Sequence, residues 1–329
     1  MKIRVLLLAV SLGLGSASAA LAAEEIRFLA IGDLPYSDAE QDAMTTSLRR
    51  AVQAADVPFV VHYGDFKSGG ESCTDALLTT SRNDILSLLP GRVFYTPGDN
   101  EWTDCDRASL THPLPELERL AKIRQLFFPQ PLTIPAEWDY QTQPLFPENT
   151  RWRVGSVLFV TLHIVGTNNG RRDILLDDPE AAIALVEARD HANRVWLDAA
   201  LAAADEQPTD AIVVVTQADI TDADTPTPCT AALTQDCDAY AEIRAQLTTT
   251  AATFDQPMLL IHGDTNPYCL DAEFGGDRAP KLWRLNAWGD YQTPPDATEI
   301  VVRPDHAEQP FQIQTLIGKR APDPQCSSD

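Results

Sequence analysis

Between residues 24 and 100, short apolar runs alternate with amphipathic segments. Runs that are apolar at nearly every position are typical of strands buried on both faces, whereas apolar residues every three or four positions predict helices. The predicted strands are Ile26–Ile31, Val57–Tyr63 and Arg92–Thr96, and the predicted helices are Ser37–Ala55 and Asp75–Leu89. This alternation predicts parallel strands joined by right-handed crossovers, and therefore an α/β fold.

The alternation continues through the rest of the chain. The predicted helices there are Leu114–Phe128, Asp178–Ala204 and Tyr240–Ala252. The predicted strands are Arg151–Val154, Val157–Val165, Ala211–Thr216 and Met258–His262. Three later apolar runs are expected to form an antiparallel set that completes a second sheet, at Leu282–Leu285, Glu299–Val302 and Phe311–Leu316. Residues 24–329 show no linker or repeat, so we expect one domain.

One stretch departs from this pattern. Pro129–Thr150 contains five prolines and has no regular periodicity. Long irregular segments are uncommon in compact domains and often act as lids over functional sites. A plain surface excursion is the alternative, and the sequence does not decide between the two.

The N-terminus has the features of an export signal. Lys2 and Arg4 form a basic start, Val5–Gly15 is apolar, and Ala20-Leu21-Ala22 is a cleavage site of the A-x-A type. The apolar segment is too short to span a bilayer, and no later segment is long enough, so membrane insertion is not expected. Residues 1–23 are therefore predicted to be a signal peptide, and the mature protein to be periplasmic or secreted.

The net charge of the chain argues against anionic partners. The formal net charge is −23. Such a surface repels the phosphates of nucleic acids and anionic lipids, so we expect neither as a partner. Cations would concentrate in any acidic cleft. The oligomeric state does not follow from the sequence.

The six cysteines indicate disulfides. An even number in an exported protein is typical of structural bridges, and the C-x2-C spacing of zinc sites is absent. The sequence leaves the pairing open. If the strands before them are neighbours, Cys73–Cys105 would join two site loops, and Cys229–Cys237 would close a small local loop. Cys269 would then hold the C-terminal tail through Cys326.

Four predicted strands end in the dipeptide Gly-Asp. The aspartates are Asp33, Asp65, Asp99 and Asp264. Ligands of open α/β sheets bind at the carboxyl ends of the strands, so these side chains are expected to converge on one site. Asp is also common in turns, and unconnected acidic turns are the alternative.

Converging carboxylates need a positive charge between them, or their pKa values must rise. Oxygen ligands with few nitrogens favour Mg²⁺, Mn²⁺ or Ca²⁺ over Zn²⁺ or iron. Two such ions about 3.5–4 Å apart suit the hydrolysis of a phosphoester. The expected partner is therefore a small phosphorylated substrate or ligand.

The order of these motifs resembles the calcineurin-like metallophosphoesterase family. The resemblance covers Gly32-Asp33, Gly64-Asp65, Gly98-Asp99-Asn100-Glu101, Gln217 and Gly263-Asp264-Thr265-Asn266. The longer strings GDLPY, GDFKSG, PGDNEWTDC, LHIVGTNN, TQAD and HGDTN are similar to a bacterial exported branch. The resemblance implies an α/β/β/α sandwich of two mixed sheets flanked by helices.

The resemblance also implies roles for the aspartates. Asp33 would bind a first metal, Asp65 would bridge two metals, and Asp99 stands where the family has an Asn ligand of the second. Every nitrogen ligand is replaced, because Pro35, Gln217, Asp264 and Asn266 stand at histidine positions. Gln217, Asp264 and Asn266 are the expected ligands there.

Asn100 stands where the family has the histidine that protonates the leaving group. An amide cannot do this, which would lower the rate by about 10²–10⁴ unless the leaving group is good. His163 is the candidate replacement, and a buried structural histidine is the alternative. His62 and His262 lie in apolar strands and are expected in the core.

Four loop residues beside the motifs are candidates for contact with substrate: Tyr36, Lys67, Asn168 and Asn169. They could instead cap turns. Trp102 could stack on a substrate ring or anchor its loop. Two other functions stay open: a non-catalytic relative that binds a cation or phosphorylated ligand, and a structural envelope protein with no cleft at the aspartates.

Overall fold

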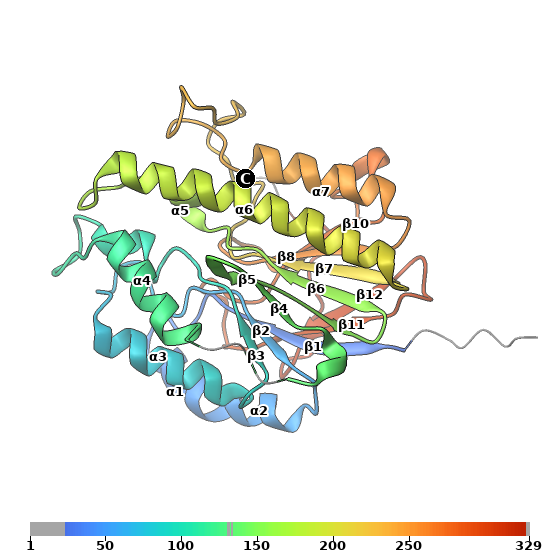
Figure 1. Cartoon of the computed structure of the whole chain (residues 1–329). Helices are drawn as coiled ribbons and strands as arrows, with labels where there is room; N and C mark the ends of the chain where they lie inside the picture. The colour runs from blue at the N-terminus through green and yellow to red at the C-terminus, as the bar shows by residue number, and fades with distance from the viewer. Residues whose placement is uncertain (1–23, 130–131, 133, 327–329) are drawn as a thin grey trace, which may run out of the picture.

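Two β-sheets lie face to face in the computed structural model of this protein, and helices cover both outer faces (Figure 1). The structure describes residues 24–129, 132 and 134–326. The expected signal peptide, residues 1–23, lies outside the described residues. The predicted α/β architecture of two mixed sheets flanked by helices is confirmed.

The first sheet has five strands in the order β12-β11-β1-β2-β3. Strands β1, β2 and β3 are parallel, whereas β11 is antiparallel to both β1 and β12. The bounds are Ile26–Ile31 for β1, Val60–His62 for β2, Val93–Tyr95 for β3, Thr298–Val302 for β11 and Phe311–Thr315 for β12.

The second sheet has seven strands in the order β4-β5-β6-β7-β8-β10-β9. Strands β6, β7, β8 and β10 are parallel, and the outer strands are antiparallel to their neighbours. The bounds are Gln141–Gln143 for β4, Phe146–Val154 for β5, Val157–Thr161 for β6, Ala211–Val215 for β7, Met258–His262 for β8, Cys269–Asp271 for β9 and Leu282–Asn286 for β10.

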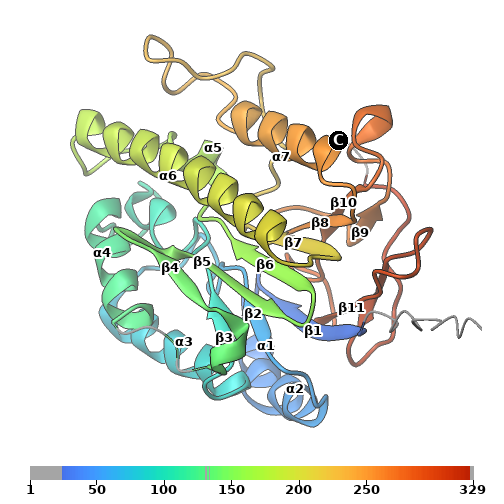
Figure 2. The ribbon, with the colours of Figure 1, turned by 45° about the vertical axis from the view of Figure 1, so that its right-hand side comes forward.

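The helices form two outer layers (Figures 1 and 2). One layer packs on the five-stranded sheet and contains α1 (Asp38–Ala43), a π-helical turn at Met44–Leu48, α2 (Arg49–Ala54), α3 (Asp75–Leu88) and α4 (Glu116–Phe127). The other packs on the seven-stranded sheet and contains α6 (Pro179–Glu206) and α7 (Ala241–Thr253). The short α5 (Gly166–Gly170) follows β6.

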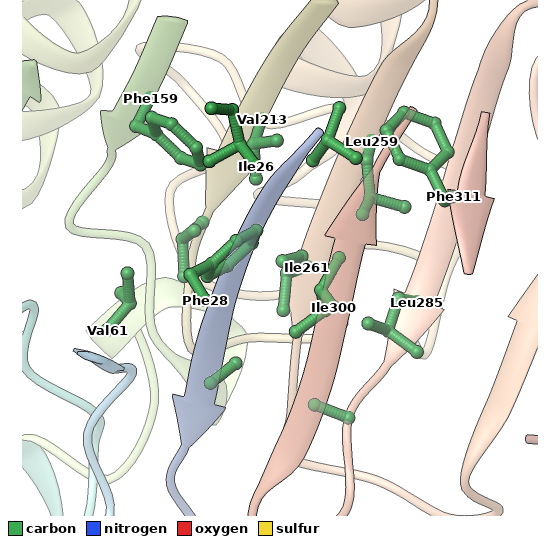
Figure 3. Packing of buried hydrophobic residues seen from close by; sticks show 14 of the residues in the cluster. Ile26, Phe28, Val61, Phe159, Val213, Leu259, Ile261, Leu285, Ile300 and Phe311 are labelled. Carbon is green, nitrogen blue, oxygen red and sulfur yellow. The ribbon is translucent and has the colours of Figure 1, made fainter. Parts of the chain in front are cut away.

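The strands are apolar at nearly every position because both of their faces are buried. In β1, Phe28 and Ala30 point into the space between the sheets, whereas Leu29 and Ile31 face the helices. The residues between the sheets come from both sheets and interdigitate there (Figure 3). This is why the strands read as continuous apolar runs rather than as alternating ones.

Phe59 lies at the centre of this core. Its ring is 4.9 Å from the ring of Phe159, 5.2 Å from that of Phe28 and 5.4 Å from that of Trp152. Phe28 belongs to one sheet, and Phe159 and Trp152 belong to the other. The aromatic cluster therefore joins the two sheets directly.

Two sequence-based expectations about the strands are wrong. The three C-terminal strands do not form one antiparallel set: β10 pairs in parallel with β8 in the second sheet, whereas β11 and β12 extend the first sheet beyond β1. The described part of Pro129–Thr150 is also not wholly irregular, because it contains β4 and the first half of β5. Pro144 lies between the two strands and Pro147 lies near the start of β5. Pairing across the sheet, which the local pattern does not show, determines both outcomes.

The cysteines pair as Cys73–Cys105, Cys229–Cys237 and Cys269–Cys326. The first bridge connects the segments that follow β2 and β3, which are neighbouring strands. Cys229–Cys237 closes a local loop, and Cys269–Cys326 ties the C-terminal segment to β9. Among the described residues, no helix is long and apolar enough to cross a membrane.

We expect Phe59→Ala to lower the free energy of unfolding by about 3–5 kcal/mol, because it leaves a cavity between the two sheets. Leu145→Ala is the control, since that side chain is 87% exposed in the turn between β4 and β5. The measurement is urea denaturation followed by circular dichroism. A loss no larger than that of the control would contradict a core centred on Phe59.

Candidate metal centre

The carboxyl ends of strands from both sheets meet at one edge of the sandwich. Asp33 follows β1, Asp65 follows β2, Asp99 follows β3 and Asp264 follows β8. Three of these residues have left-handed backbones, with φ of 52° at Asp33, 54° at Asp65 and 71° at Asp264. β1, β2 and β8 are therefore followed by a sharp turn at the aspartate, whereas Asp99 lies four residues after the end of β3.

The preceding glycines are required by close approach. A Cβ on Gly263 would lie 1.8 Å from Asp33 Oδ2, and a Cβ on Gly98 would lie 2.0 Å from Asp65 Oδ1. Any larger residue would displace the carboxylates. The Gly-Asp dipeptide thus serves two needs at once: space at the first position and a tight turn at the second.

Asp65, Asp99 and Asp264 each present an oxygen within 4.8 Å of the others. Asp33 joins this group from the side, because its Oδ2 accepts a hydrogen bond of 3.1 Å from the backbone N–H of Asp264. Asp33 Oδ1 is buried and has no hydrogen-bond partner. The structure therefore brings together the four aspartates that the strand pattern places at one edge.

Burial and mutual repulsion disfavour the charged forms of these carboxyls. Burial raises the pKa of Asp65 well above its usual value, and Asp99 and Glu101 raise it further. The same holds for Asp264, whose neighbours are Asp99 and Asp33. For Asp33, burial raises the pKa most and Asp290 adds to it. Without a counter-charge, this site can hold its full negative charge only at considerable cost.

Gln217, at the end of β7, lies among these carboxylates with its amide nitrogen toward them. Its Nε2 donates to Asp65 Oδ2 at 3.0 Å and to Asp99 Oδ1 at 3.1 Å. Its Oε1 accepts from the backbone N–H of Gly166 at 2.7 Å, which determines the orientation of the amide. An NH₂ group is not a metal ligand, so Gln217 could act as the expected ligand only after its amide rotates.

The side chain of Asn266, the other expected ligand, is bonded to Asp290. Its side chain is exposed and donates to the backbone oxygen of Asp290 at 3.0 Å and to its Oδ2 at 2.6 Å. It therefore braces the loop after β10. The sequence motif places Asn266 two residues after Asp264, but the chain turns away between them.

Asn100 and Tyr36 lie beside the carboxylates. The backbone N–H of Asn100 donates to Asp65 Oδ1 at 3.1 Å, and its Nδ2 donates to the Tyr36 hydroxyl at 3.3 Å. The Tyr36 hydroxyl is also 3.4 Å from Asp65 Oδ2. Both residues therefore lie next to Asp65, and the Asn100 side chain offers an amide rather than an acid.

Lys67 is almost fully buried in this acidic environment. Its Nζ donates to the backbone oxygen of Ser68 at 2.8 Å. Burial lowers its pKa, while Asp104, Glu101 and Asp65 oppose that shift. The ammonium group is therefore one of the positive charges close to the cluster.

Asn168 and Asn169 have structural partners. The Asn168 side chain donates to the backbone oxygens of Gln235 and Cys237, so it holds the disulfide loop. The Asn169 side chain accepts from Arg189 and donates to Asp190. These bonds favour the turn-capping alternative over contact with substrate.

His163 is fully buried between Glu148 and Trp102. Its Nδ1 lies 3.3 Å from Glu148 Oε1, and its ring centroid is 5.5 Å from that of Trp102. Burial, with a contribution from Arg189, lowers the pKa of His163 to about 4. A histidine that is neutral near pH 7 cannot protonate a leaving group, so this placement favours the structural alternative.

His62, His262 and Trp102 are also buried, as expected for core or anchoring residues. His62 and His262 are fully buried, and burial lowers the pKa of both, that of His62 to about 3. Trp102 is 1% exposed and lies under the guanidinium of Arg189. Trp102 therefore anchors its loop and is too buried to stack on a substrate ring.

Four neighbours of the cluster were missed by sequence reasoning. Thr167 donates to Asp99 Oδ2 at 2.7 Å and to Asp104 Oδ1 at 3.1 Å. Asp104 is buried, and burial together with Asp99 raises its pKa to about 7. Burial raises the pKa of Asp290 to about 6, with Asp99 adding to it. Arg107 forms an ion pair of 2.7 Å with Asp104.

Only one of these had a local signal. Asp290 follows Gly289, as the four cluster aspartates follow glycines, but the chain before it does not end in an unbroken apolar run. Thr167 is directed to Asp99 by three successive left-handed residues, Thr167, Asn168 and Asn169. Such a turn is rare in the absence of glycine and is not predictable from residue type.

Comparison with known proteins gives structural similarities only. No family model and no curated protein matches the sequence. The solved structures that are similar include purple acid phosphatase PPD1 from yellow lupin, Lupinus luteus (TM-score 0.49, 9% identity, 92% of this chain and 53% of that one). They also include PhoD (TM-score 0.45, 12% identity, 90% of this chain and 69% of that one) and the NAD nucleotidase NadN of Haemophilus influenzae (TM-score 0.40, 12% identity, 89% of this chain and 50% of that one).

The chain thus spans about half the length of the lupin phosphatase. Similarities at this level do not assign an activity. The site has to be judged on its own residues.

A hard divalent cation fits those residues. The cluster offers carboxylate oxygens from three close aspartates and a buried Asp33 oxygen without a hydrogen-bond partner. A bound cation would also lower the raised pKa values of these carboxyls. It offers no imidazole or thiolate among the grouped residues, which favours Mg²⁺, Mn²⁺ or Ca²⁺ over softer metals.

We expect the metal-free protein to lose thermal stability as the pH rises from about 6.5 to about 8. Below that range the buried His62, His163 and His262, whose pKa values are lowered by burial, have the opposite effect. A carboxyl whose pKa is raised by folding stabilises the folded state fully below its unfolded pKa of about 3.9, and this contribution disappears as the pH passes the folded value. The folded values here are about 6 for Asp290 and about 7 for Asp104. The measurement is calorimetry in the presence of a chelator.

Adding Mn²⁺ should raise the melting temperature more at the higher pH, because the carboxyls are then free to bind it. Asp65→Asn should lose this response. Asp56→Asn should keep it, since Asp56 is an exposed aspartate with the same left-handed backbone (φ 50°) in the turn before β2. A melting temperature insensitive to both pH and cation would contradict a metal centre.

Proposed function

We propose that this protein is an exported, metal-dependent hydrolase of small phosphoesters. The observation that carries the proposal is the convergence of Asp33, Asp65, Asp99 and Asp264 on one edge, with three of them within 4.8 Å. The order of their motifs resembles the calcineurin-like metallophosphoesterases, which supports the same conclusion. The export signal at residues 1–23 and the single domain over 24–329 are part of this proposal.

The four aspartates would hold one or two divalent cations. A bound cation would polarise a phosphoryl oxygen and neutralise the charge that develops there. Around it, the chain's own residues would position the substrate. Asn100 and Tyr36 lie next to Asp65, and their amide and hydroxyl can donate to phosphate oxygens.

Neither of the two expected catalytic residues can protonate the leaving group. The Asn100 side chain is an amide, and His163 is buried and neutral near pH 7. A missing general acid costs about 10²–10⁴ in rate with a poor leaving group and little with a good one. The proposed enzyme therefore favours activated esters or anhydrides.

The contacts of Gln217 support a second candidate function, in which the protein binds a cation or a phosphorylated ligand without catalysis. Its amide already donates to Asp65 and Asp99, which partly satisfies the acceptors that a metal would need. This function predicts stabilisation by ligand without turnover. Reproducible turnover that depends on a metal would exclude it.

We expect Asp65→Asn to reduce metal-dependent hydrolysis of 4-nitrophenyl phosphate by more than about 100-fold, the upper range for residues that only support metal ligands. Asp56→Asn should retain the wild-type rate, because it makes the same chemical change in a left-handed turn away from the cluster. The measurement is steady-state kinetics with Mn²⁺, Mg²⁺ and Ca²⁺ in turn.

The leaving group provides a separate test. An enzyme without a general acid should hydrolyse a nitrophenyl ester faster than a simple alkyl ester by about 10²–10⁴ or more. Activity that survives Asp65→Asn would remove the proposal, and comparable rates on both esters would show that a proton donor is present.

A further inference from the structure

An exposed aromatic ring stands at the rim of the carboxylate cluster. Tyr291 lies in the loop after β10 and is 69% exposed. Tyr63, Tyr95, Tyr240 and Tyr268, in contrast, are buried. The surface of Tyr291 is therefore available to a planar group from solvent.

The loop that carries Tyr291 is held next to the cluster. The backbone N–H of Asp290 donates to the backbone oxygen of Asp33 at 3.1 Å, and that of Gln292 donates to Gly289 at 2.9 Å. Asn266 clamps Asp290 from the other side. Tyr291 is thus one residue from a direct contact with the first aspartate of the site.

The backbone of this loop is unusual. Asp290 has φ of 39° and Tyr291 has φ of 63°. A bulky aromatic residue rarely adopts the left-handed region, and such strain persists only where the surroundings hold it. Here a strained backbone presents a large apolar ring to water instead of burying it.

Tyr36 links this ring to the aspartates. The ring centroids of Tyr36 and Tyr291 are 5.0 Å apart, with the planes tilted by 57°. The Tyr36 hydroxyl lies 3.4 Å from Asp65 Oδ2 and accepts from Asn100 at 3.3 Å. A phosphate held beside Asp65 would therefore have its esterified group next to the aromatic pair.

A cationic group lies near Asn100 as well. A Cβ on Gly69 would be 2.4 Å from Arg107 Nη1 and 2.7 Å from Asn100 Oδ1, so the guanidinium and the amide converge there. Arg107 is partly exposed, with 39% of its side chain accessible. The rim thus combines a guanidinium suited to phosphate with two rings suited to a planar group.

We propose that the Tyr36–Tyr291 pair is a stacking platform that selects phosphoesters whose alcohol carries a planar ring, as in a nucleoside phosphate. This inference rests on the proposed phosphoester site and names its substrate class. Stacking of a base on an aromatic side chain contributes about 1–3 kcal/mol, which is sufficient to discriminate between otherwise identical esters.

The test compares adenosine 5′-monophosphate with ribose 5-phosphate, because both are esters of the primary 5-hydroxyl of a ribose and only one ligand has a base. We expect the Mn²⁺-loaded protein to bind the nucleotide about 5-fold or more tighter in calorimetry, the lower limit of a stacked base. In Tyr291→Asn, which keeps the left-handed backbone favourable, the ratio of the two Kd values should fall toward one.

Two further variants test whether a change in the ratio of the two Kd values is due to loss of the aromatic ring. Tyr291→Phe keeps the ring and should keep the ratio. Leu145→Ala removes an exposed apolar residue with φ of 69° in the turn between β4 and β5, and it should also keep the ratio. Circular dichroism and melting temperature show whether each variant folds.

Equal affinity for the two ligands in the wild type, no measurable binding of the nucleotide, or an unchanged ratio in Tyr291→Asn would overturn the platform. If only the hydrolase proposal is wrong, the protein still binds the nucleotide more tightly than ribose 5-phosphate, but it hydrolyses neither ester. Turnover of both ligands without a preference would retain the hydrolase and remove the platform.

Discussion

Repulsion between like charges is the constraint on which this site depends. Four aspartates from four different strands meet at one edge of the sandwich, and burial leaves them little water to reduce their repulsion. Such an arrangement is stable only if protons, hydrogen-bond donors or a cation compensate the charge. The raised pKa values of Asp33, Asp65 and Asp264 express that need, and a divalent cation meets it in one step.

The fold supports this unfavourable cluster through contacts below it. Glu101 is fully buried and accepts from the Tyr95 hydroxyl at 2.7 Å, from Gly98 at 2.8 Å and from the backbone of Asp65 at 3.0 Å. One carboxylate thereby joins the loops after two neighbouring strands. The Cys73–Cys105 bridge connects the same two loops further along the chain. The site is consequently positioned by its surroundings before any ion binds.

The orientation of the Gln217 amide bears on both proposed functions. With its amide nitrogen toward Asp65 and Asp99, it lowers the cost of the cluster without a metal. With the amide rotated, its oxygen would face the carboxylates and could bind a cation, at the cost of the bond from Gly166. The balance between the two proposed functions would therefore depend on one side-chain torsion and on the ion that competes with it.

The sequence by itself determined the α/β class, most of the strands and helices, and the aspartates of the cluster. It could do so because burial on both faces leaves unbroken apolar runs, and because a glycine followed by an aspartate provides space at the strand ends and, at Asp33, Asp65 and Asp264, a left-handed turn. These are local signals. The tertiary structure alone decided which sheet β10, β11 and β12 join, since strand pairing depends on partners far along the chain.

Tertiary structure also decided the final membership of the site. Asn266 and His163 have the right residue types, but the chain path takes one outward to Asp290 and the other inward to Glu148. Thr167 and Tyr291 reach the rim through left-handed backbones, which only the packed loops can maintain. Residue type specifies what chemistry a side chain can perform, whereas its direction depends on the whole fold.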